Sequence, residues 1–179
     1  EAHDPDAVFS SIDTAGRYRF GAQPAIAQWN LARYAESLLP LLSPDPSADP
    51  DLIEAATTRI RLFDRAFEDA YLARMRRKLG LTEATKRSAQ DDQALVDDLR
   101  RLMHAERLDH TRTFRLLAQV LRGDSDAISA LTADPPAWTS WQDRWLTALD
   151  GADAAATAEA MDTVNPLYVP RNHLVEEAL

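Results

Sequence analysis

The chain has 179 residues, a net charge of −9 and a pI of about 4.9, and this acidic balance argues against a nucleic-acid-binding protein, which needs a basic face. Its 45% hydrophobic and 27% charged residues are typical of a globular protein and exclude a disordered one. The absence of cysteine excludes disulfides, thiolate zinc sites and a cysteine nucleophile, and no apolar run approaches the ~18–20 residues of a membrane span. We therefore predict a cytoplasmic protein that binds neither nucleic acid nor a membrane.

Residues 1–22 are predicted to form a loop. The stretch SSIDTAGRYRFGAQP, residues 10–24, places Arg17, Tyr18, Arg19 and Phe20 in succession between two glycines. In a docked loop the aromatic rings are buried and the arginines bind carboxylates or phosphate with their planar forks. Packing alone explains the same residues, so a binding loop and a structural loop remain alternatives. Residues 165–172, NPLYVPRN, mix polar, aromatic and proline residues in the same way.

The next element is a predicted helix over residues 23–39, because Pro24 suits the first helical turn. Apolar side chains fall on two sides of this helix, which predicts that neighbouring elements cover it. Trp29 is then expected to be largely buried, with its indole N–H bonded to a polar neighbour.

A proline-rich loop, SPDPSADP, precedes a long helix that Asp49 caps and Gly80 ends. Four basic residues lie near the end of this helix: Arg74, Arg76, Arg77 and Lys78. The favoured interpretation is that they stabilise the negative end of the helix dipole. A partner-binding patch is the alternative.

The remainder of the chain is predicted to be helical as well. Helices are expected at residues 91–104, 109–121, 125–131, from 135 onward, 153–164 and from 172 to the end, with Asp109 and Asn172 as caps. The spacing of Trp138, Trp141 and Trp145 is more typical of a core than of an aromatic ligand cage, with Trp145 expected on a more peripheral helix than Trp29. The predicted fold class is all-α, a multi-helix bundle of about seven or eight helices in which residues 23–179 form one helical domain.

No catalytic, cofactor-binding or metal-ligating residue is predicted in this chain. The isolated glycines do not form a phosphate-cradling loop. Two pairs have four-residue spacing, Glu106 with His110 and His173 with Glu177, and a structural or solvated role is favoured over metal ligation for both. The adjacent carboxylates Glu68 and Asp69 are interpreted as part of a solvated face.

Two long stretches of the chain carry a specific pattern. They are SSIDTAGRYRFGAQPAIAQWNLARYAESLLPLL and NPLYVPRNHLVEEAL, with YLARMRRKLGL, DLRRLM and TRTFRLL in order between them. The pattern D-x-x-G-R-Y-x-(F/Y)-x-x-Q-P…W-N-L is represented by Asp13, Gly16, Arg17, Tyr18, Phe20, Gln23, Pro24, Trp29, Asn30 and Leu31. In these residues, and nearly from end to end, the chain resembles the selenoprotein O family of pseudokinase-like protein adenylyltransferases.

The resemblance implies a kinase-like fold that binds ATP in an inverted pose and transfers AMP to Ser, Thr or Tyr hydroxyls of proteins, with Mg²⁺ or Mn²⁺. The family's lysine, phosphate-binding arginines, base aspartate, metal asparagine and Asp-Tyr-Gly-Pro motif have no counterpart here. The chain is therefore expected to be a C-terminal part of the large lobe, truncated at both ends, that binds neither ATP nor metal by itself. Its expected partners are the upstream catalytic domain of the same chain and the protein substrates.

Further expectations follow from the resemblance. Residues 1–22 correspond to a kinase activation segment, and the helix over residues 23–39 corresponds to the central buried helix of the large lobe. In many members a cysteine of the activation segment pairs with a cysteine or selenocysteine near the C-terminus. Phe9 stands near the expected position of the first cysteine, which puts redox control by such a pair in doubt for this protein. The alternative function is a non-enzymatic helical interaction or scaffold domain. A carboxylate-bridged metal bundle ranks last, because the paired Glu-x-x-His motifs that it needs are absent.

Overall fold

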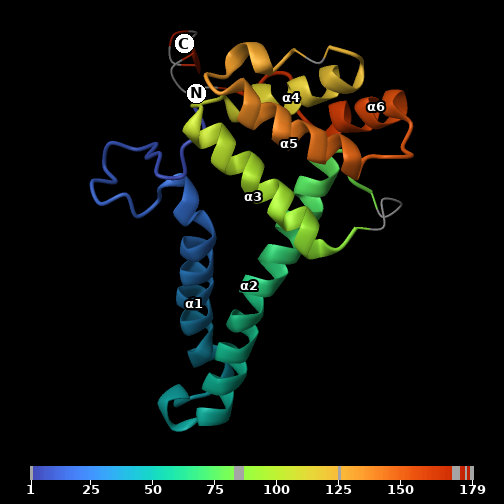
Figure 1. Ribbon diagram of the computed structural model, residues 1–179. Helices are drawn as coiled ribbons and strands as arrows, with labels where there is room; N and C mark the ends of the chain where they lie inside the picture. Colours follow the sequence, from blue (N-terminus) through green and yellow to red (C-terminus); the bar gives the residue numbers. More distant parts are fainter. Residues whose placement is uncertain (1, 83–86, 125, 171–173, 176, 178–179) are drawn as a thin grey trace. The chain divides into compact units, whose positions relative to one another are not determined.

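The computed structural model describes residues 2–82, 87–124, 126–170, 174–175 and 177. Its helices are α1 (Gln23–Leu42), α2 (Pro50–Lys78), α3 (Ala89–Ala105), α4 (His110–Leu121), α5 (Pro135–Ala148) and α6 (Ala154–Val164), with 3₁₀ turns η1 (Phe20–Ala22), η2 (Pro46–Ala48) and η4 (Ser129–Leu131) (Figure 1). Within the described ranges there is no strand, and a single antiparallel bridge joins Ala2 to Asp109. The all-α fold class is therefore confirmed, with six α-helices in the described part of the chain.

The helix ends are set largely by the residues that the sequence singles out. The Asp109 carboxylate accepts the Arg112 N–H at 2.8 Å, and the Asp49 carboxylate accepts the Leu52 N–H at 3.0 Å, so both caps are confirmed. Gly80 follows α2 with a φ of +72°, and the Leu81 N–H closes the helix end on the Arg76 carbonyl. The predicted cap Asn172 lies outside the described residues.

The short helix predicted at residues 125–131 is wrong in type. The described part of this segment makes turns and then the 3₁₀ turn η4, because its backbone hydrogen bonds span three or four residues without continuing into a helix. The last predicted helix, from residue 172, lies partly outside the described residues. These two segments account for the difference between the predicted number of helices and the six that the structure describes.

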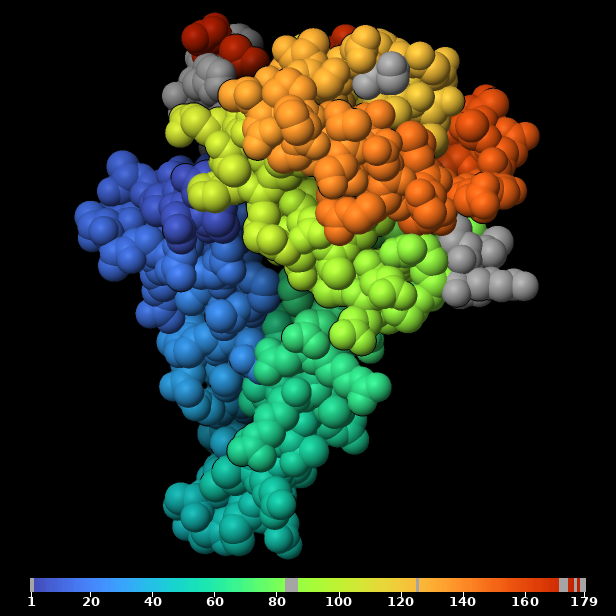
Figure 2. Space-filling model, in the orientation of Figure 1, coloured from blue at the N-terminus to red at the C-terminus, as the bar shows by residue number. Residues whose placement is uncertain are grey.

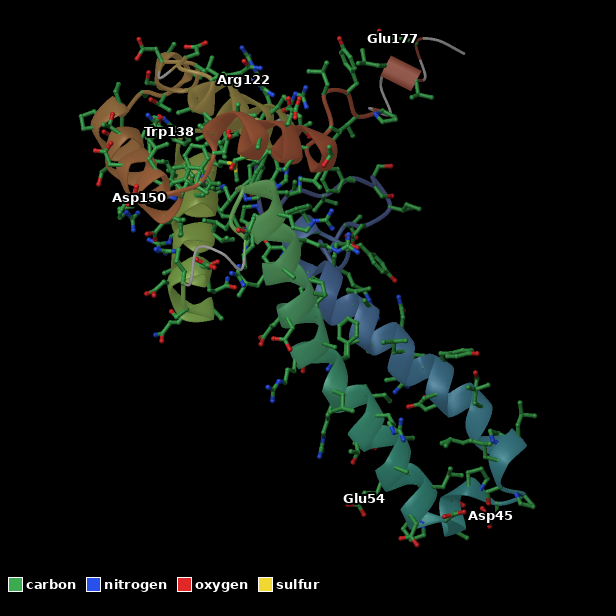
Figure 3. All side chains as sticks on the ribbon, turned by 90° about the vertical axis from the view of Figure 1, so that its right-hand side faces the viewer. Asp45, Glu54, Arg122, Trp138, Asp150 and Glu177 are labelled. Atoms are coloured by element: carbon green, nitrogen blue, oxygen red, sulfur yellow. The ribbon has the colours of Figure 1, made fainter. Side chains whose placement is uncertain are left out.

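The chain divides into two compact units, and each is considered by itself. The amino-terminal unit comprises residues 4–71, and the carboxyl-terminal unit comprises residues 72–179 with the residues up to His3. The boundary falls inside α2, after Tyr71. In the amino-terminal unit, α1 and α2 are joined by a loop that contains η2 and Asp45 (Figure 3).

The core of the carboxyl-terminal unit is built around the tryptophans of α5. Trp138, Trp141 and Trp145 are buried, and each indole N–H donates a hydrogen bond, to Gln142 Oε1, Leu95 O and Leu79 O at 2.8–3.0 Å. Figure 3 shows Trp138 among the side chains gathered between the helices of this unit. The prediction of a tryptophan core is confirmed. Trp145 is wrongly predicted to be peripheral, because its side chain is 0% exposed.

The amino-terminal unit has no buried side chain anywhere in residues 4–71. Trp29 is 45% exposed, so the prediction that it is buried is wrong for this chain. The physical reason is that no element of the unit packs over its side of α1. The ring is contacted by arginine side chains instead of a core, with the Arg17 guanidinium 4.3 Å and the Arg33 guanidinium 5.5 Å from its centroid.

Candidate functional site

The loop that precedes α1 is built around Asp13. Its two carboxylate oxygens accept the N–H groups of Arg17 and Tyr18 at 2.8 and 2.7 Å. Gly16, with a φ of +64°, turns the backbone so that both N–H groups face the carboxylate. The Gln23 side chain donates to the Tyr18 carbonyl at 2.6 Å, which joins the loop to the first turn of α1. The pattern that carries the family resemblance therefore describes a hydrogen-bonded loop with a defined conformation.

The base of the same loop is closed by contacts with the first residues of the unit. Backbone N–H groups of Phe20 and Gly21 donate to the carbonyls of Ala7 and Pro5 at 2.9 and 2.7 Å. A Cβ atom at position 21 would lie 2.9 Å from the Pro5 carbonyl oxygen, so only glycine allows this approach. The loop returns close to where it began and presents its arginine side chains outward.

The Arg17 side chain is held by aromatic contacts rather than by an acid. Its guanidinium stacks on Trp29 at 4.3 Å and lies 5.7 Å from the Tyr18 ring centroid. Arg19, by contrast, forms an ion pair with Asp6 at 3.1 Å, and Arg33 forms one with Glu36. Among the described residues, no carboxylate forms an ion pair with Arg17. Its planar fork is therefore available to bind a carboxylate or phosphate.

The second segment that the sequence singles out is anchored by Asn165. This side chain is buried, donates to the Lys78 carbonyl at 2.9 Å and accepts from the Lys78 ammonium at 3.1 Å. Arg115 donates to the Asn165 carbonyl at 3.2 Å and forms an ion pair with Asp162 at 2.8 Å. Tyr168, further along, is exposed. The asparagine thus has a structural role, joining the end of α6 to the end of α2, and residues 171–173 lie outside the described part.

Lys78 and His110 form a partly buried basic cluster in the carboxyl-terminal unit. Burial lowers the pKa of Lys78, whose ammonium lies 4.9 Å from the Phe114 ring centroid. Burial, and then the positive charge of Lys78, lower the pKa of His110 to about 4. The His110 ring also packs against Phe114 and His3, with centroids 4.9 and 5.6 Å away. At neutral pH the histidine is therefore uncharged in a largely apolar setting.

The basic residues at the end of α2 do not act as one group. Arg76 forms an ion pair at 2.8 Å with Asp92, a fully buried residue of α3 that also pairs with Arg87 at 2.7 Å. Lys78 is bound to Asn165, as described above. The prediction that these two residues act on the helix dipole therefore leaves out their main contacts, since Arg76 pairs with Asp92 and Lys78 is bonded to Asn165. The sequence contained no signal for the Asp92 pairing, because its two partners come from the end of α2 and from the segment before α3.

The acidic pair and the two metal-spaced pairs that the sequence singles out have different outcomes. The Glu106 carboxylate accepts the Ala133 N–H at 2.5 Å, while the His110 ring is packed elsewhere, as described above. Glu68 and Asp69 are exposed, as predicted. His173 lies outside the described residues, so the pair with Glu177 is not tested. In the part of the chain that the structure describes, no group of three or more His, Asp or Glu side chains could hold a metal ion.

Two features of the described residues have chemical potential. They are the loop with the available Arg17 guanidinium and the partly buried cluster of Lys78 and His110. No described helix is both long enough and apolar enough to span a bilayer. A guanidinium held against an aromatic ring can bind a carboxylate or a phosphate, which is a binding or positioning role.

Comparison with known proteins gives one consistent result. The family model for the protein adenylyltransferase SelO matches residues 1–179. The protein nucleotidyltransferase YdiU of Chromobacterium violaceum is 47% identical over 184 residues, which cover all of this chain and 37% of that protein. The proteins of the same name from Rhodococcus jostii and Mycobacterium sp. are 46% and 44% identical, and the chain covers 34% and 35% of their lengths. The chain thus spans about a third of the curated relatives that it matches.

Proposed function

The chain belongs to the SelO family of protein adenylyltransferases, and from this premise we propose that it is the C-terminal helical part of a cytoplasmic enzyme that transfers AMP from ATP to Ser, Thr or Tyr hydroxyls of proteins. The observation that carries the proposal is the family match over residues 1–179. It is supported by relatives at 44–47% identity that are named protein nucleotidyltransferases. A kinase-like fold for the whole enzyme is part of the same proposal.

In this reaction the hydroxyl oxygen of the protein substrate bonds to the α-phosphorus of ATP. The bond from that phosphorus to the bridging oxygen breaks, pyrophosphate leaves, and the hydroxyl proton passes to a base. Such transfer depends on positioned charges around the phosphates. Among the described residues no group of three or more His, Asp or Glu side chains could hold a metal ion, the Lys78 ammonium is bonded to Asn165 and the Asp92 carboxylate to two arginines. As part of the same proposal, we assign the nucleotide and metal groups to the part of the relatives' length that this chain does not cover.

The loop before α1 is the part of this chain that we assign to the active enzyme. The hydrogen bonds of Asp13 and Gln23 fix its conformation, and its exposed Tyr18 and Arg17 side chains can contact a neighbouring surface. By analogy with an activation segment, the loop would border the site where the protein substrate binds. A loop whose conformation is fixed by such hydrogen bonds orders its contact groups before binding, which lowers the entropic cost of association.

The test is a chimera in which this chain replaces the matched 184 residues of the Chromobacterium violaceum protein. The chimera, the unmodified relative and the 179-residue chain are each incubated with ATP labelled at the α-phosphate, Mg²⁺ or Mn²⁺, and a protein substrate. We expect label on protein from the relative and the chimera, and none from the isolated chain. Metal-dependent labelling by the isolated chain would contradict the assignment of the catalytic groups. A chimera that is inert beside an active relative would contradict the proposed function.

A further inference from the structure

Ala2 and His3, called the strap below, are held on the carboxyl-terminal unit by backbone contacts. Ala2 forms the antiparallel bridge with Asp109, and the His3 N–H donates to the Leu108 carbonyl at 2.7 Å. The His3 carbonyl lies 3.3 Å from Nδ1 of His104, near the end of α3. Figure 2 shows the start of the chain, in the darkest blue, against the yellow-green end of α3. The strap belongs to the same compact unit as α3 and α4, so all of these contacts are internal to that unit.

The side chain that the strap buries is a histidine. His3 is 6% exposed, and its ring packs against the His110 ring with the two centroids 5.6 Å apart. His110 in turn packs on Phe114, with centroids 4.9 Å apart. With His104 at the strap carbonyl, three of the chain's four histidines gather around these two residues. Titratable rings therefore take the place that apolar side chains normally have in such a contact.

The surroundings of these rings oppose a positive charge. Burial is the main reason that the pKa of His110 is lowered to about 4, and the Lys78 ammonium at the end of α2 is the next. The strap's own ring and Arg100 of α3 act in the same direction. The Asp109 carboxylate, at the start of α4, favours the charged form but has less effect than Lys78. His104 adds a further titratable ring on the carbonyl side of the strap.

A proton on His3 affects the docked strap and the released strap differently. In the docked strap the charge would be taken out of water and placed against the His110 ring, close to the charge of Lys78. The acid that follows in the chain, Asp4, has a carboxylate that accepts the Asp6 N–H at 2.9 Å. In the released strap the ring is in water, where a histidine takes up a proton with a pKa of about 6.5. Acid therefore favours release.

We propose that the strap is an acid-sensitive clasp, which is docked while His3 and His110 are neutral and is released as the pH falls from about 7 to about 5. The released segment leads directly into the loop before α1. His3 is followed by Asp4 and Pro5, and the Pro5 carbonyl accepts the Gly21 N–H at the base of that loop. The clasp thus makes the anchoring of the chain ahead of this loop depend on pH. The inference uses contacts within this chain only and does not depend on the proposed function.

The test follows the exchange of the His3 amide proton with water in the complete 179-residue chain. The chain is labelled with ¹⁵N, and its amino terminus is acetylated so that the terminal amine does not titrate. Exchange rates measured by NMR at pH 7, 6 and 5 are divided into the intrinsic rates to give protection factors. We expect the protection of His3 to fall about tenfold or more from pH 7 to pH 5, because the released strap gains a proton.

The Leu99 amide distinguishes release of the strap from unfolding of the unit. Leu99 lies in α3 and is 0% exposed, so its amide exchanges only when the core of the unit opens. We expect Leu99 to remain at least about tenfold better protected than His3 at each pH, as local release requires.

Matched variants identify the group that responds to acid. His3→Gln and His3→Phe keep the backbone contacts of the strap, one with a polar side chain and one with an aromatic ring, but neither can take up a proton. Protection at position 3 should change by less than about threefold between pH 7 and pH 5 in the variants. His104→Gln is the control, because glutamine and histidine can both donate to the strap carbonyl. It should retain the fall of about tenfold.

Four outcomes would overturn the proposal. Absence of His3 protection at pH 7 shows that the strap is not docked, and equal protection at pH 7 and pH 5 shows that acid does not release it. A fall in both position-3 variants as large as in the unmodified chain shows that another group responds. Exchange of Leu99 as fast as that of His3 shows that the unit opens as a whole.

Discussion

Both units of this chain are built from helices with apolar stripes, yet only the carboxyl-terminal unit has a core. Its helices α3 to α6 bury three tryptophans, Phe114 and Met103, while α1 and the first turns of α2 bury nothing. The contrast teaches that apolar periodicity shows which face of a helix can be buried. It does not show whether another element of the same chain covers that face. The four predictions below test this contrast, beginning with the largest effect.

The first prediction compares a tryptophan from each unit. Trp145→Ala should lower the free energy of unfolding by about 3–5 kcal/mol, because a large buried ring is removed and its cavity remains. Trp29→Ala should cost about 1 kcal/mol or less, since its exposed ring loses mainly cation–π contacts. Urea unfolding followed by far-UV circular dichroism measures both. Similar losses for the two variants would mean that the units do not differ in their cores.

The second prediction compares a buried ion pair with an exposed one. Asp92→Ala should cost about 3–5 kcal/mol, because Arg76 and Arg87 lose the carboxylate that they share in the interior. Glu36→Ala, which removes the exposed partner of Arg33 on α1, should cost about 0.5 kcal/mol or less. The urea midpoints of the two variants, each compared with that of the unmodified chain, measure the two losses of stability. An unchanged midpoint for Asp92→Ala would show that its burial is not part of the stable core.

The third prediction concerns acid, to which the two units should respond differently. The pKa of His110 is lowered to about 4 in the folded state and is about 6.5 when unfolded. Below pH 6.5 the unfolded state binds a proton that the folded state does not accept until about pH 4, so stability is present above pH 6.5 and is lost as the pH falls. The full loss is about 3 kcal/mol.

Hydrogen exchange between pH 7 and pH 5 measures the part of this loss that develops by pH 5, about 2 kcal/mol. Protection of α4 amides should decrease toward pH 5 after correction for the intrinsic exchange rate, and His110→Gln should remove most of the decrease. The amino-terminal unit contains no histidine and should show no such change. A parallel decrease in both units would indicate that another group is responsible.

The fourth prediction compares two glycines that both have positive φ. Gly80→Ala should cost about 2–3 kcal/mol, because the left-handed conformation is strained for alanine and the new methyl would lie 2.5 Å from Thr157 Cγ2. Gly16→Ala carries only the backbone strain of about 1–2 kcal/mol, since its nearest neighbour is 3.6 Å away. Thermal unfolding ranks the two variants. A larger effect at Gly16 would mean that α6 does not pack tightly on the end of α2.

Much of the fold could be predicted from local sequence signals. The caps Asp49 and Asp109, the end of α2 at Gly80 and the tryptophan core of α5 all follow from short-range rules of capping and periodicity. The exposure of Trp29 could not be predicted from the same rules. It depends on which other segments surround α1, and the periodicity of one helix contains no information on them.

The candidate site was predictable only in part. The pattern containing Asp13 and Arg17 marked the loop before α1, but its internal hydrogen bonds and the stacking on Trp29 became visible only in the structure. The pairing of Asp92 with Arg76 and Arg87 was not predicted, because a carboxylate on a helix is normally expected to be exposed to solvent. Contacts between residues far apart in the sequence have no local signature.

The tryptophan column of α5 has an optical consequence. The rings of Trp141 and Trp145 are nearly parallel, inclined by 14° with centroids 5.8 Å apart, and Trp138 lies 5.2 Å from Trp141. Electronic transitions of rings at this spacing couple, so absorbed light energy migrates among the three indoles before emission and gives paired near-ultraviolet bands of opposite sign. Trp29 is the remaining tryptophan and belongs to the other unit. The intrinsic absorption and emission of this chain therefore carry a coupled signal from the core of one unit and a single-ring signal from the surface of the other.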